Sequence, residues 1–270
     1  MHGDHGLPYH SSTLNLAQRY PYYLIARLLE RKALNKCNAF ISVSQATKKE
    51  FVQNYKINPS KIEVIYNGID TSFFKYRNAN WLRHQLGLAD EKILLYVGFS
   101  TPRKGLETLA QALNLLKETN LKLVMVGKWE KGYREKFYNA VGKDKPRIIE
   151  TGYVPDQDMP QYYCLADVFV LPSLLEGFGF PLVEAMACGT PIISTDVGAI
   201  PEVVGDCGII VPPKDSRQLA QSIDRLIKDD ALRENYKRKS RQRVCDNFSE
   251  QAMVAKTLNV YQKVNAQILS

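Results

Sequence analysis

Short, continuously apolar runs alternate with longer helical patterns along most of this sequence. The runs are rich in β-branched residues and lie at 39–44, 61–66, 92–97, 121–126, 147–150, 168–171, 191–194 and 208–211. Strands covered on both faces have no polar face, so such runs are typical of a parallel sheet between two helical layers. Helical patterns occupy 104–118, 131–142, 216–228 and 230–247. The stretch from about 91 to 215 therefore predicts a doubly wound parallel sheet.

The first part of the chain follows a different pattern. An amphipathic helix is indicated by residues at helical spacing: Ile25, Leu28, Leu29, Ala33 and Cys37. A strand–helix–strand pattern follows, and two strands alone do not make a stable open sheet. We therefore expect an incomplete α/β portion with the interdomain crossover at 1–75, and a complete Rossmann-like domain at 76–248. A C-terminal helix at 249–270 is expected to pack back toward the N-terminal portion.

Composition narrows the class of protein. The chain is 45% hydrophobic and 24% charged, as soluble globular proteins are, and its net charge of +8 favours an anionic partner. Its five cysteines are scattered without a Cys-x-x-Cys pair, which predicts buried thiols in a reducing compartment. No apolar run approaches the roughly 18 residues of a membrane span. These features predict a cytoplasmic protein.

One strand-to-helix connection, "LPSLLEGFGFPLVEAMACGTPIIS" (171–194), carries more special residues than such a turn needs. Gly177 and Gly179 let the backbone approach a bound group that a side chain would block. Glu176 and Glu184 do not share a helical face. They bracket the carboxyl end of a strand, where open α/β sheets bind ligands. The alternative is that Glu184 complements a helix dipole and Glu176 is solvated.

The helix after this turn predicts an anion site at its N-terminus. Pro181 suits the first helical position, because its missing N–H costs nothing there. The amides of Leu182 and Val183 would then point out of the helix end toward an anion.

A second connection, "LLYVGFSTPRKGLETL" (94–109), places two cations at the start of a helix. Gly98 begins the turn, and Arg103 and Lys104 open the helix. Adjacent cations oppose the helix dipole there, so an anion is expected beside them. Neither the Walker pattern nor G-x-G-x-x-G is complete. The alternative is a pair of surface cations.

Two further charged features have structural interpretations. Asp156 and Asp158 could pair on a metal, but their place before a helix favours an N-cap role. Six of the eleven residues 233–243 are Lys or Arg. A solvated helix face is the expectation for them, with membrane or nucleic-acid contact as the alternatives. No nucleic-acid motif accompanies them.

Several motifs together resemble one family. The segment "EGFGFPLVEAMACGTPIISTDVGAIPEVVGDCGIIVPPKD" (176–215) resembles the donor-site signature of the family 4 retaining glycosyltransferases, also called glycosyl transferases group 1, which have the GT-B fold. The segments "ISVSQATKKEF", "KIEVIYNGID", "YVGFSTPRKGLETLAQAL" and "GYVPDQDMPQYYCLADVFVLPS" match flanking patterns in the same order. The resemblance covers about residues 40 to 268 and implies an α/β GT-B type fold.

The resemblance implies a place for the transferred sugar. Glu176 corresponds to the glutamate at the reaction centre, and Gly177, Phe178 and Gly179 would offer amides to the sugar hydroxyls. The chain begins "MHGDHG", so His2 corresponds to the active-site histidine of the family. Most of the family's N-terminal domain, on the order of 100 residues or more, is expected to be lacking.

The resemblance also implies a nucleotide site. Glu184 would hold the ribose hydroxyls, and Tyr153 with Val154 lies where the base rests. Leu182 and Val183 would give amides to the phosphates.

The phosphate clamp departs from the family pattern at one position. Lys104 matches the phosphate-binding lysine, but Phe99 stands where many members have arginine. Arg103 is expected to replace that cation, beside the Gly98 turn.

The implied reaction transfers a sugar from a nucleoside diphosphate sugar to an acceptor hydroxyl with retention of configuration. We expect no metal or other cofactor, a UDP- or GDP-sugar donor, a glycan or lipid-linked acceptor and no nucleic acid. The main alternative is a nucleotide-sugar-binding subunit or inactive homologue that needs a partner subunit or a second copy of itself. A sugar-nucleotide epimerase of the same fold ranks lower. The apolar and basic segment 20–33 is expected in a core, with peripheral membrane contact as the alternative.

Overall fold

The computed structural model describes residues 29–34, 36–117, 120–142 and 147–269. The chain divides into two compact units, and each is described by itself. Unit 1 takes its described residues from 1–66 and 254–270, and unit 2 is residues 67–253. The predicted amphipathic helix lies partly outside the described residues. Its described part, residues 29–34, is helical.

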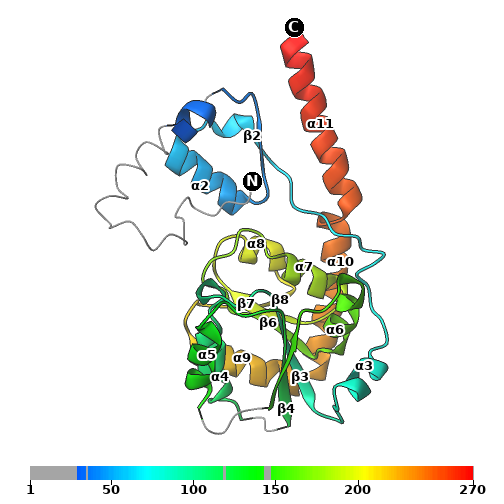
Figure 1. Cartoon of the computed structure of the whole chain (residues 1–270). Coiled ribbons are helices and arrows are strands. Elements are labelled where there is room, and N and C mark those ends of the chain that lie inside the picture. Colours follow the sequence, from blue (N-terminus) through cyan, green and yellow to red (C-terminus); the bar gives the residue numbers. More distant parts are fainter. Residues whose placement is uncertain (1–28, 35, 118–119, 143–146, 270) are drawn as a thin grey trace, which may run out of the picture. The chain divides into compact units, whose positions relative to one another are not determined.

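Unit 2 is built on a six-stranded parallel sheet with the order β5-β4-β3-β6-β7-β8 (Figure 1). The strands are β3 (Lys92–Val97), β4 (Leu121–Val126), β5 (Arg147–Gly152), β6 (Val168–Leu171), β7 (Ile192–Thr195) and β8 (Gly208–Val211). The strand order grows in opposite directions from β3 and β6, which makes their junction a topological switch point. The predicted doubly wound sheet is thus confirmed.

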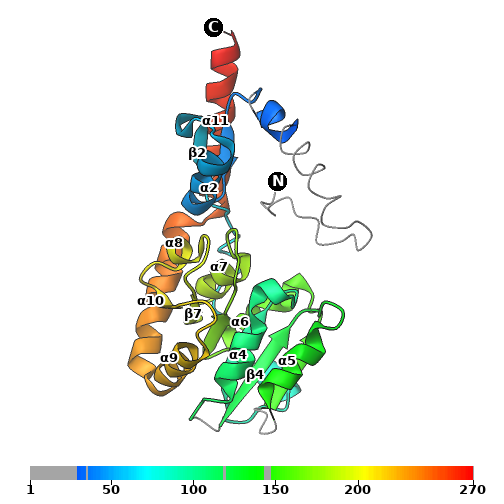
Figure 2. The same ribbon diagram turned by 90° about the vertical axis from the view of Figure 1, so that its left-hand side faces the viewer.

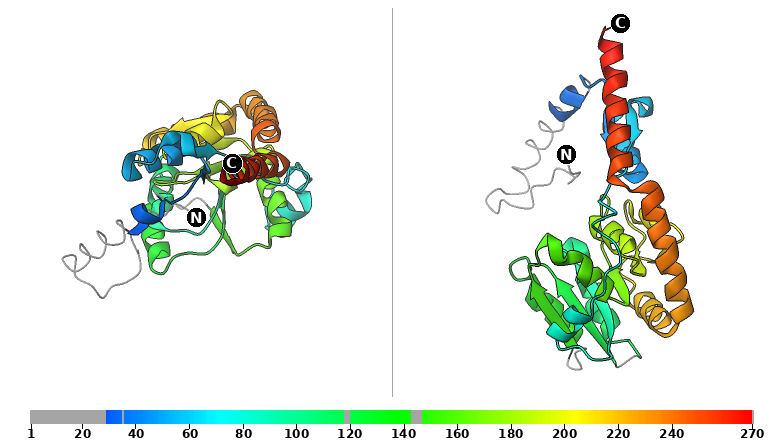
Figure 3. Two further views of the ribbon diagram at one scale, coloured as in Figure 1. Left: turned by 90° about the horizontal axis from the view of Figure 1, so that it is seen from above. Right: turned by 90° about the vertical axis from the view of Figure 1, so that its right-hand side faces the viewer.

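Helices cover both faces of this sheet. On one face α4 (Leu106–Leu113) contacts α5 (Tyr133–Val141) and α9 (Ser216–Lys228), and Figure 2 shows α4 and α5 beside β4. On the other face lie α3 (Asn80–Gln85), α6 (Met159–Leu165), α7 (Phe180–Ala187) and α10 (Asp230–Asn247). Helix α10, drawn in orange, runs along the side of unit 2 (Figure 3). The short helix α8 (Ile200–Val204) follows β7.

Local sequence explains where the last two sheet-covering helices begin. The Asp215 carboxylate accepts from the Gln218 amide at the start of α9, and Asp229 accepts from Leu232 at the start of α10. Carboxylate caps satisfy amides that have no partner within a helix. Both helices have the bounds predicted from sequence: each begins at a capping aspartate, and α9 also has a clear amphipathic period.

Unit 1 contains a two-stranded parallel sheet among its described residues, formed by β1 (Phe40–Ser42) and β2 (Ile62–Val64). The crossover between them is α2 (Gln45–Tyr55), which Ser44 caps, followed by the turn η1 (Pro59–Lys61). Helix α11 (Glu250–Leu269) begins in unit 2, and its residues from Val254 belong to unit 1. No described helix is both long and apolar enough to cross a membrane.

The prediction that all cysteines are buried is wrong. Cys188 and Cys207 are buried and Cys164 is half-buried, but Cys37 and Cys245 are exposed. Cys245 lies on the outer side of α10, where neighbouring residues are also exposed. A scattered cysteine carries no periodic signal, so its depth depends on the helix face that it happens to occupy.

Candidate functional site

The loops after β3 and β6 meet through a buried ion pair. Lys104 lies in the turn η2 (Pro102–Lys104), and its Nζ donates to Glu176 Oε2 at 2.6 Å. Arg103 NH1 lies 3.9 Å from the same oxygen, and Ser173 Oγ donates to it at 3.3 Å. Lys104 is only 5% exposed. Burial lowers the pKa of Lys104, and the charge of Glu176 opposes that shift.

Two glycines allow these loops to come so close. Gly105 has a φ of +64°, and a Cβ there would lie 2.1 Å from the Pro172 carbonyl oxygen. Gly198 has a φ of +53°, and its Cβ would lie 2.0 Å from the Glu176 carbonyl oxygen. The Leu174 amide also donates to the Arg103 carbonyl at 2.7 Å. Backbone thus touches backbone on both sides of Glu176, which fixes that residue at the switch point.

Glu184 lies on α7 and has a partner of its own. Tyr163 on α6 is fully buried and donates its hydroxyl to Glu184 Oε2 at 2.6 Å. Burial raises the pKa of Glu184, while the hydrogen bond from Tyr163 lowers it and the charge of Asp156 raises it. The hydrogen bond from Tyr163 thereby fixes one oxygen of the Glu184 carboxylate in the protein without a ligand.

The Gly-Phe-Gly turn places Phe178 inward and Gly177 outward. Phe178 is 4% exposed and packs edge-to-face on Phe180 and Phe248. Gly177 is exposed, and Gly179 has a φ of +88° that favours glycine. The buried Phe178 ring anchors the turn, so the chain at Gly177 lies at the surface above it.

The expected free amides of Leu182 and Val183 are engaged. Helix α7 begins at Phe180, one residue earlier than predicted, so Pro181 occupies the second helical position. Both amides donate to the Gly179 carbonyl, at 2.9 Å from Leu182 and 3.4 Å from Val183. The outward amides that sequence reasoning expected at this helix end therefore belong to its first hydrogen-bonded turn, because the helix starts earlier.

The loop after β5 carries an exposed aromatic residue. Tyr153 is 67% exposed, and the Lys128 ammonium lies 5.9 Å from its ring centroid. Val154 beside it is buried. On β5 itself, Glu150 accepts from Trp129 and forms an ion pair with Arg134 at 2.9 Å. The contacts of Glu150 fix the end of β5, and the Tyr153 ring in the loop that follows remains accessible.

Gly98 ends β3 in a conformation that suits glycine. Its φ is +149°, and its amide donates to the Val126 carbonyl at 2.9 Å. A Cβ at Gly98 would lie 3.2 Å from Tyr96 Oη and 3.9 Å from Lys104 Cε. The glycine therefore lies directly beside the side chain of Lys104. His2, the last predicted site residue, lies outside the described residues.

The expected N-cap role of the aspartates is not realised by their side chains. Asp158 occupies the N-cap position of α6 but makes no capping hydrogen bond, and Asp156 begins the turn η3 (Asp156–Asp158). The 3₁₀ turn continues directly into the helix, so Asp158 has a helical backbone and its carboxylate does not face the amides. Among the described residues, no group of three or more His, Cys, Asp or Glu could hold a metal ion.

The basic run on α10 is not a simple solvated face, which corrects the prediction. Arg241 donates to the carbonyls of Thr71, Phe74 and Ala187 at 2.7–2.9 Å. Arg243 donates to the carbonyls of Val203 and Glu202, and Arg233 to those of Leu226 and Ile227. The sequence shows that many cations lie close together in this helix. It does not show that backbone carbonyls of neighbouring elements accept hydrogen bonds from them.

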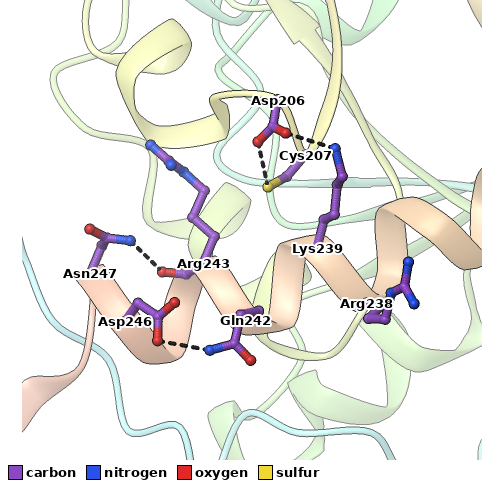
Figure 4. A pocket seen from close by; sticks show the side chains of 8 residues that line it. All are labelled: Asp206, Cys207, Arg238, Lys239, Gln242, Arg243, Asp246 and Asn247. Carbon is purple, nitrogen blue, oxygen red and sulfur yellow. Dashed lines mark hydrogen bonds and ion pairs between the residues drawn. The ribbon is translucent and has the colours of Figure 1, made fainter.

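A surface pocket of about 410 Å³ lies over α10, and neither Lys104, Glu176 nor Glu184 lines it. Its lining is Asp206, Cys207, Arg238, Lys239, Gln242, Arg243, Asp246 and Asn247 (Figure 4). Lys239 pairs with Asp206 at 2.7 Å, and Gln242 donates to Asp246 at 2.9 Å. Lys239 and Asp206 neutralise each other there, whereas the Arg238 side chain lies near the Asn235 amide oxygen at 3.5 Å and Arg243 donates to the backbone carbonyls of Glu202 and Val203.

Sequence reasoning missed four residues that shape the site. Ser173 contacts Glu176, Tyr163 holds Glu184, Gly198 supports the Glu176 loop and Tyr96 lies beside Gly98. Tyr163 and Tyr96 lie within apolar periodic stretches, where an aromatic residue predicts core packing. Only the tertiary structure shows where their hydroxyls point.

Known families match this arrangement. The family model for Glycosyl transferases group 1 matches residues 80–243, which is more than half of the chain. The chain belongs to this family. The model for Glycosyltransferase Family 4 matches residues 1–73 of this group 1 glycosyltransferase.

Curated relatives include a glycosyltransferase of Methanocaldococcus jannaschii, 33% identical over 82% of this chain and 59% of that protein. The O-antigen chain mannosyltransferase B of Escherichia coli is 31% identical over 75% of this chain and 55% of that protein. The chain thus spans between 55 and 59% of the length of these two relatives.

Solved structures show the same fold. Sucrose-phosphate synthase from Thermosynechococcus elongatus has a TM-score of 0.80 and 28% identity, over 90% of this chain and 62% of that chain. HepE from Anabaena, in complex with UDP, has a TM-score of 0.77 and 26% identity, over 83% of this chain and 64% of that chain. The predicted α/β fold of GT-B type is confirmed.

Proposed function

We propose that this group 1 glycosyltransferase binds a nucleoside diphosphate sugar and transfers the sugar to an acceptor hydroxyl with retention of anomeric configuration. The observation that carries the proposal is the meeting of Lys104 and Glu176 at 2.6 Å, at the β3/β6 switch point of the sheet. Open α/β sheets bind nucleotides at such points. A buried cation there suits a diphosphate, and a buried carboxylate suits a sugar cation.

Each predicted residue has a role in this proposal. Lys104 and Arg103, beside Gly98, bind the diphosphate and stabilise the charge that develops on it as the sugar leaves. Glu176 stabilises the oxocarbenium-like sugar, and the turn at 177–179 gives amides to the sugar hydroxyls. We also propose a catalytic role for His2, which rests on the sequence resemblance alone.

The remaining predicted residues bind the ribose, the base and the phosphates of the nucleotide. The free oxygen of Glu184 accepts from the ribose hydroxyls, since Tyr163 already holds the other oxygen. The exposed Tyr153 ring and the adjacent Val154 provide a surface for the base. Leu182 and Val183 contribute the helix end of α7, whose partial positive charge faces the phosphates.

Donor and acceptor classes follow from chemistry and from the relatives. HepE binds UDP in its crystal structure, and two relatives are mannosyltransferases, which supports a UDP- or GDP-hexose donor. Protein cations take the place of a metal in this site. We propose a glycan or lipid-linked acceptor in polysaccharide or glycolipid synthesis, at the cytoplasmic face of a membrane. The boundaries at 1–75, 76–248 and 249–270 remain our proposal for the domains.

Calorimetric titration with UDP, GDP and ADP tests the donor site. Micromolar binding of one nucleotide by the wild type, lost in Lys104→Ala and Glu184→Ala, is the expected result. A folded chain that binds none of the three would contradict the proposal. The product's anomeric configuration, read by NMR once the donor is known, tests retention separately.

A second candidate function is donor binding without transfer. Within its described residues unit 1 has only the two short strands β1 and β2, and Ile41 on β1 is 42% exposed. Such a sheet is marginal alone, so the chain would act with a partner subunit or a second copy of itself. Nucleotide binding without transfer by the isolated chain, and transfer restored by a partner, would favour this alternative.

A further inference from the structure

Two buried hydroxyls, one at the end of β3 and one in the loop that follows it, have no hydrogen-bond partner. They are Tyr96 Oη and Thr101 Oγ1, and no other side-chain oxygen or nitrogen in the described part of the chain is buried in this way. A buried unsatisfied hydroxyl usually destabilises a fold, so each instance needs an explanation. Tyr96 is the second-last residue of β3, and Thr101 lies in the loop that carries Lys104.

The Tyr96 hydroxyl and the end of the Lys104 side chain both lie close to Gly98. The Tyr96 residue is fully buried, and its hydroxyl is 3.2 Å from the point where a Cβ of Gly98 would lie. Lys104 Cε is 3.9 Å from that same point. Burial raises the pKa of Tyr96, and the charges of Arg103 and Glu176 both act on it. The Ser100 side chain is close to the hydroxyl but does not meet hydrogen-bond geometry.

A second tyrosine, Tyr133 at the start of α5, provides the contrast. Tyr133 donates its hydroxyl to Glu107 and accepts from the Leu106 amide at 3.2 Å. The fold therefore gives the Tyr133 hydroxyl both a donor and an acceptor and leaves the Tyr96 hydroxyl without a partner. Core packing alone does not account for that difference, because phenylalanine would fill the place of Tyr96 without a buried hydroxyl.

We propose that Tyr96 is a positioning residue for Lys104: its hydroxyl accepts from the Lys104 ammonium when that group turns from Glu176 to the diphosphate of a sugar nucleotide. This inference rests on the proposed function of the site. An ammonium has three donors, and in the free protein Glu176 takes one of them. An oxygen acceptor keeps a buried ammonium charged while it exchanges one anion for another. The phenolic proton then faces Ser100.

The substitution Tyr96→Phe tests this in the full chain, because it removes only the hydroxyl. We expect UDP, GDP and inorganic pyrophosphate to bind about tenfold more weakly, as for the loss of a hydrogen bond to a charged group. Thermal stability should be unchanged or raised. Affinity should also fall off at a lower pH than in the wild type, because Lys104 then loses its proton more readily. The charged groups facing Lys104, Glu176 and Arg103, are unaltered by the substitution.

Two control variants separate positioning from loop structure. Thr101→Val removes the other unsatisfied hydroxyl and should leave the pH dependence of binding unchanged. Tyr133→Phe removes two hydrogen bonds, so it should lower stability and leave the affinity of the folded protein unchanged.

Three results would overturn the inference. The first is affinity within twofold of wild type for Tyr96→Phe with the same pH profile. The second is the same pH shift in Thr101→Val, and the third is a clear loss of stability in Tyr96→Phe. If the wild type binds and Lys104→Ala does not, any of these results refutes the role of Tyr96 while the proposed donor site stands. If the wild type itself binds no diphosphate, the proposed function fails.

Discussion

Two clusters of cations in this molecule differ in what they hold. Lys104, beside Arg103, holds the carboxylate of Glu176. Arg241 on α10, in the most basic run of the chain, holds three backbone carbonyls. An anionic ligand can replace a carboxylate, whereas displacing a backbone carbonyl leaves a buried polar group without a partner. The partner of a cation therefore separates a ligand site from a structural clamp better than the number of cations does.

The largest effect on function is expected from Lys104→Ala. Removing the ammonium deletes a charge-assisted contact to the diphosphate, so nucleotide affinity should fall about 100-fold. Titration calorimetry measures the loss, and the midpoint of thermal unfolding should change little because Glu176 keeps Ser173 and Arg103 as neighbours. Lys239→Ala, which removes an exposed lysine on α10, is the control and should leave affinity unchanged. Equal losses in the two variants would remove the distinction between the clusters.

The opposite pattern is expected from Arg241→Ala. Its three carbonyl partners at Thr71, Phe74 and Ala187 lose their donor, which should lower the free energy of unfolding by about 2–3 kcal/mol. Urea denaturation measures the change, and the affinity of the folded protein for nucleotide should stay the same. Arg238→Ala, on the exposed side of the same helix, should change stability by no more than about 0.5 kcal/mol. A stability loss shared by both variants would contradict the clamp.

A smaller effect with the opposite sign is expected from Glu176→Gln. In the free protein the carboxylate competes with the ligand for Lys104. Removing its charge should therefore tighten the binding of the nucleoside diphosphate several-fold, by about 1 kcal/mol, and abolish sugar transfer. Unchanged or weaker binding by calorimetry would show that the pair is not in competition with the ligand.

The smallest effect concerns the stability contribution of Glu184. Burial raises the pKa of this carboxyl above its ordinary value of 4.5, against the opposing hydrogen bond from Tyr163. A carboxyl with a raised folded-state pKa destabilises the fold as the pH rises through that pKa. Glu184→Gln should therefore stabilise the protein at pH 8 and stabilise it less at pH 5. A variant that is less stable than wild type at pH 8 in thermal denaturation would reverse the sign.

Sequence predicted the sheet well and the contacts of the site only in part. Strands β3, β4, β6 and β8 have the predicted bounds. A short, continuously apolar run between polar turns is typical of a parallel strand that is buried on both faces. The two short strands of unit 1 end earlier than predicted. They also begin one residue later than predicted, and only the three residues of each strand are paired.

The site depended on information that a sequence does not carry. Lys104 and Glu176 are 72 residues apart, and only the β3–β6 adjacency joins them. The amides of Leu182 and Val183 were assigned outward because Pro181 suits a first helical position, yet the helix starts at Phe180. The direction of the Tyr163 hydroxyl depends on how α6 packs against α7, which the hydrophobic periodicity of the sequence does not show.

The most direct test of the account is a double-mutant cycle on Lys104 and Glu176, measured as nucleoside diphosphate affinity by calorimetry. Wild type, Lys104→Ala, Glu176→Gln and the double variant form the cycle. If Lys104 passes from Glu176 to the diphosphate, Glu176→Gln tightens binding when Lys104 is present and has no effect in the Lys104→Ala background. The same change in both backgrounds would contradict the exchange, because Glu176 would then act on the ligand without Lys104.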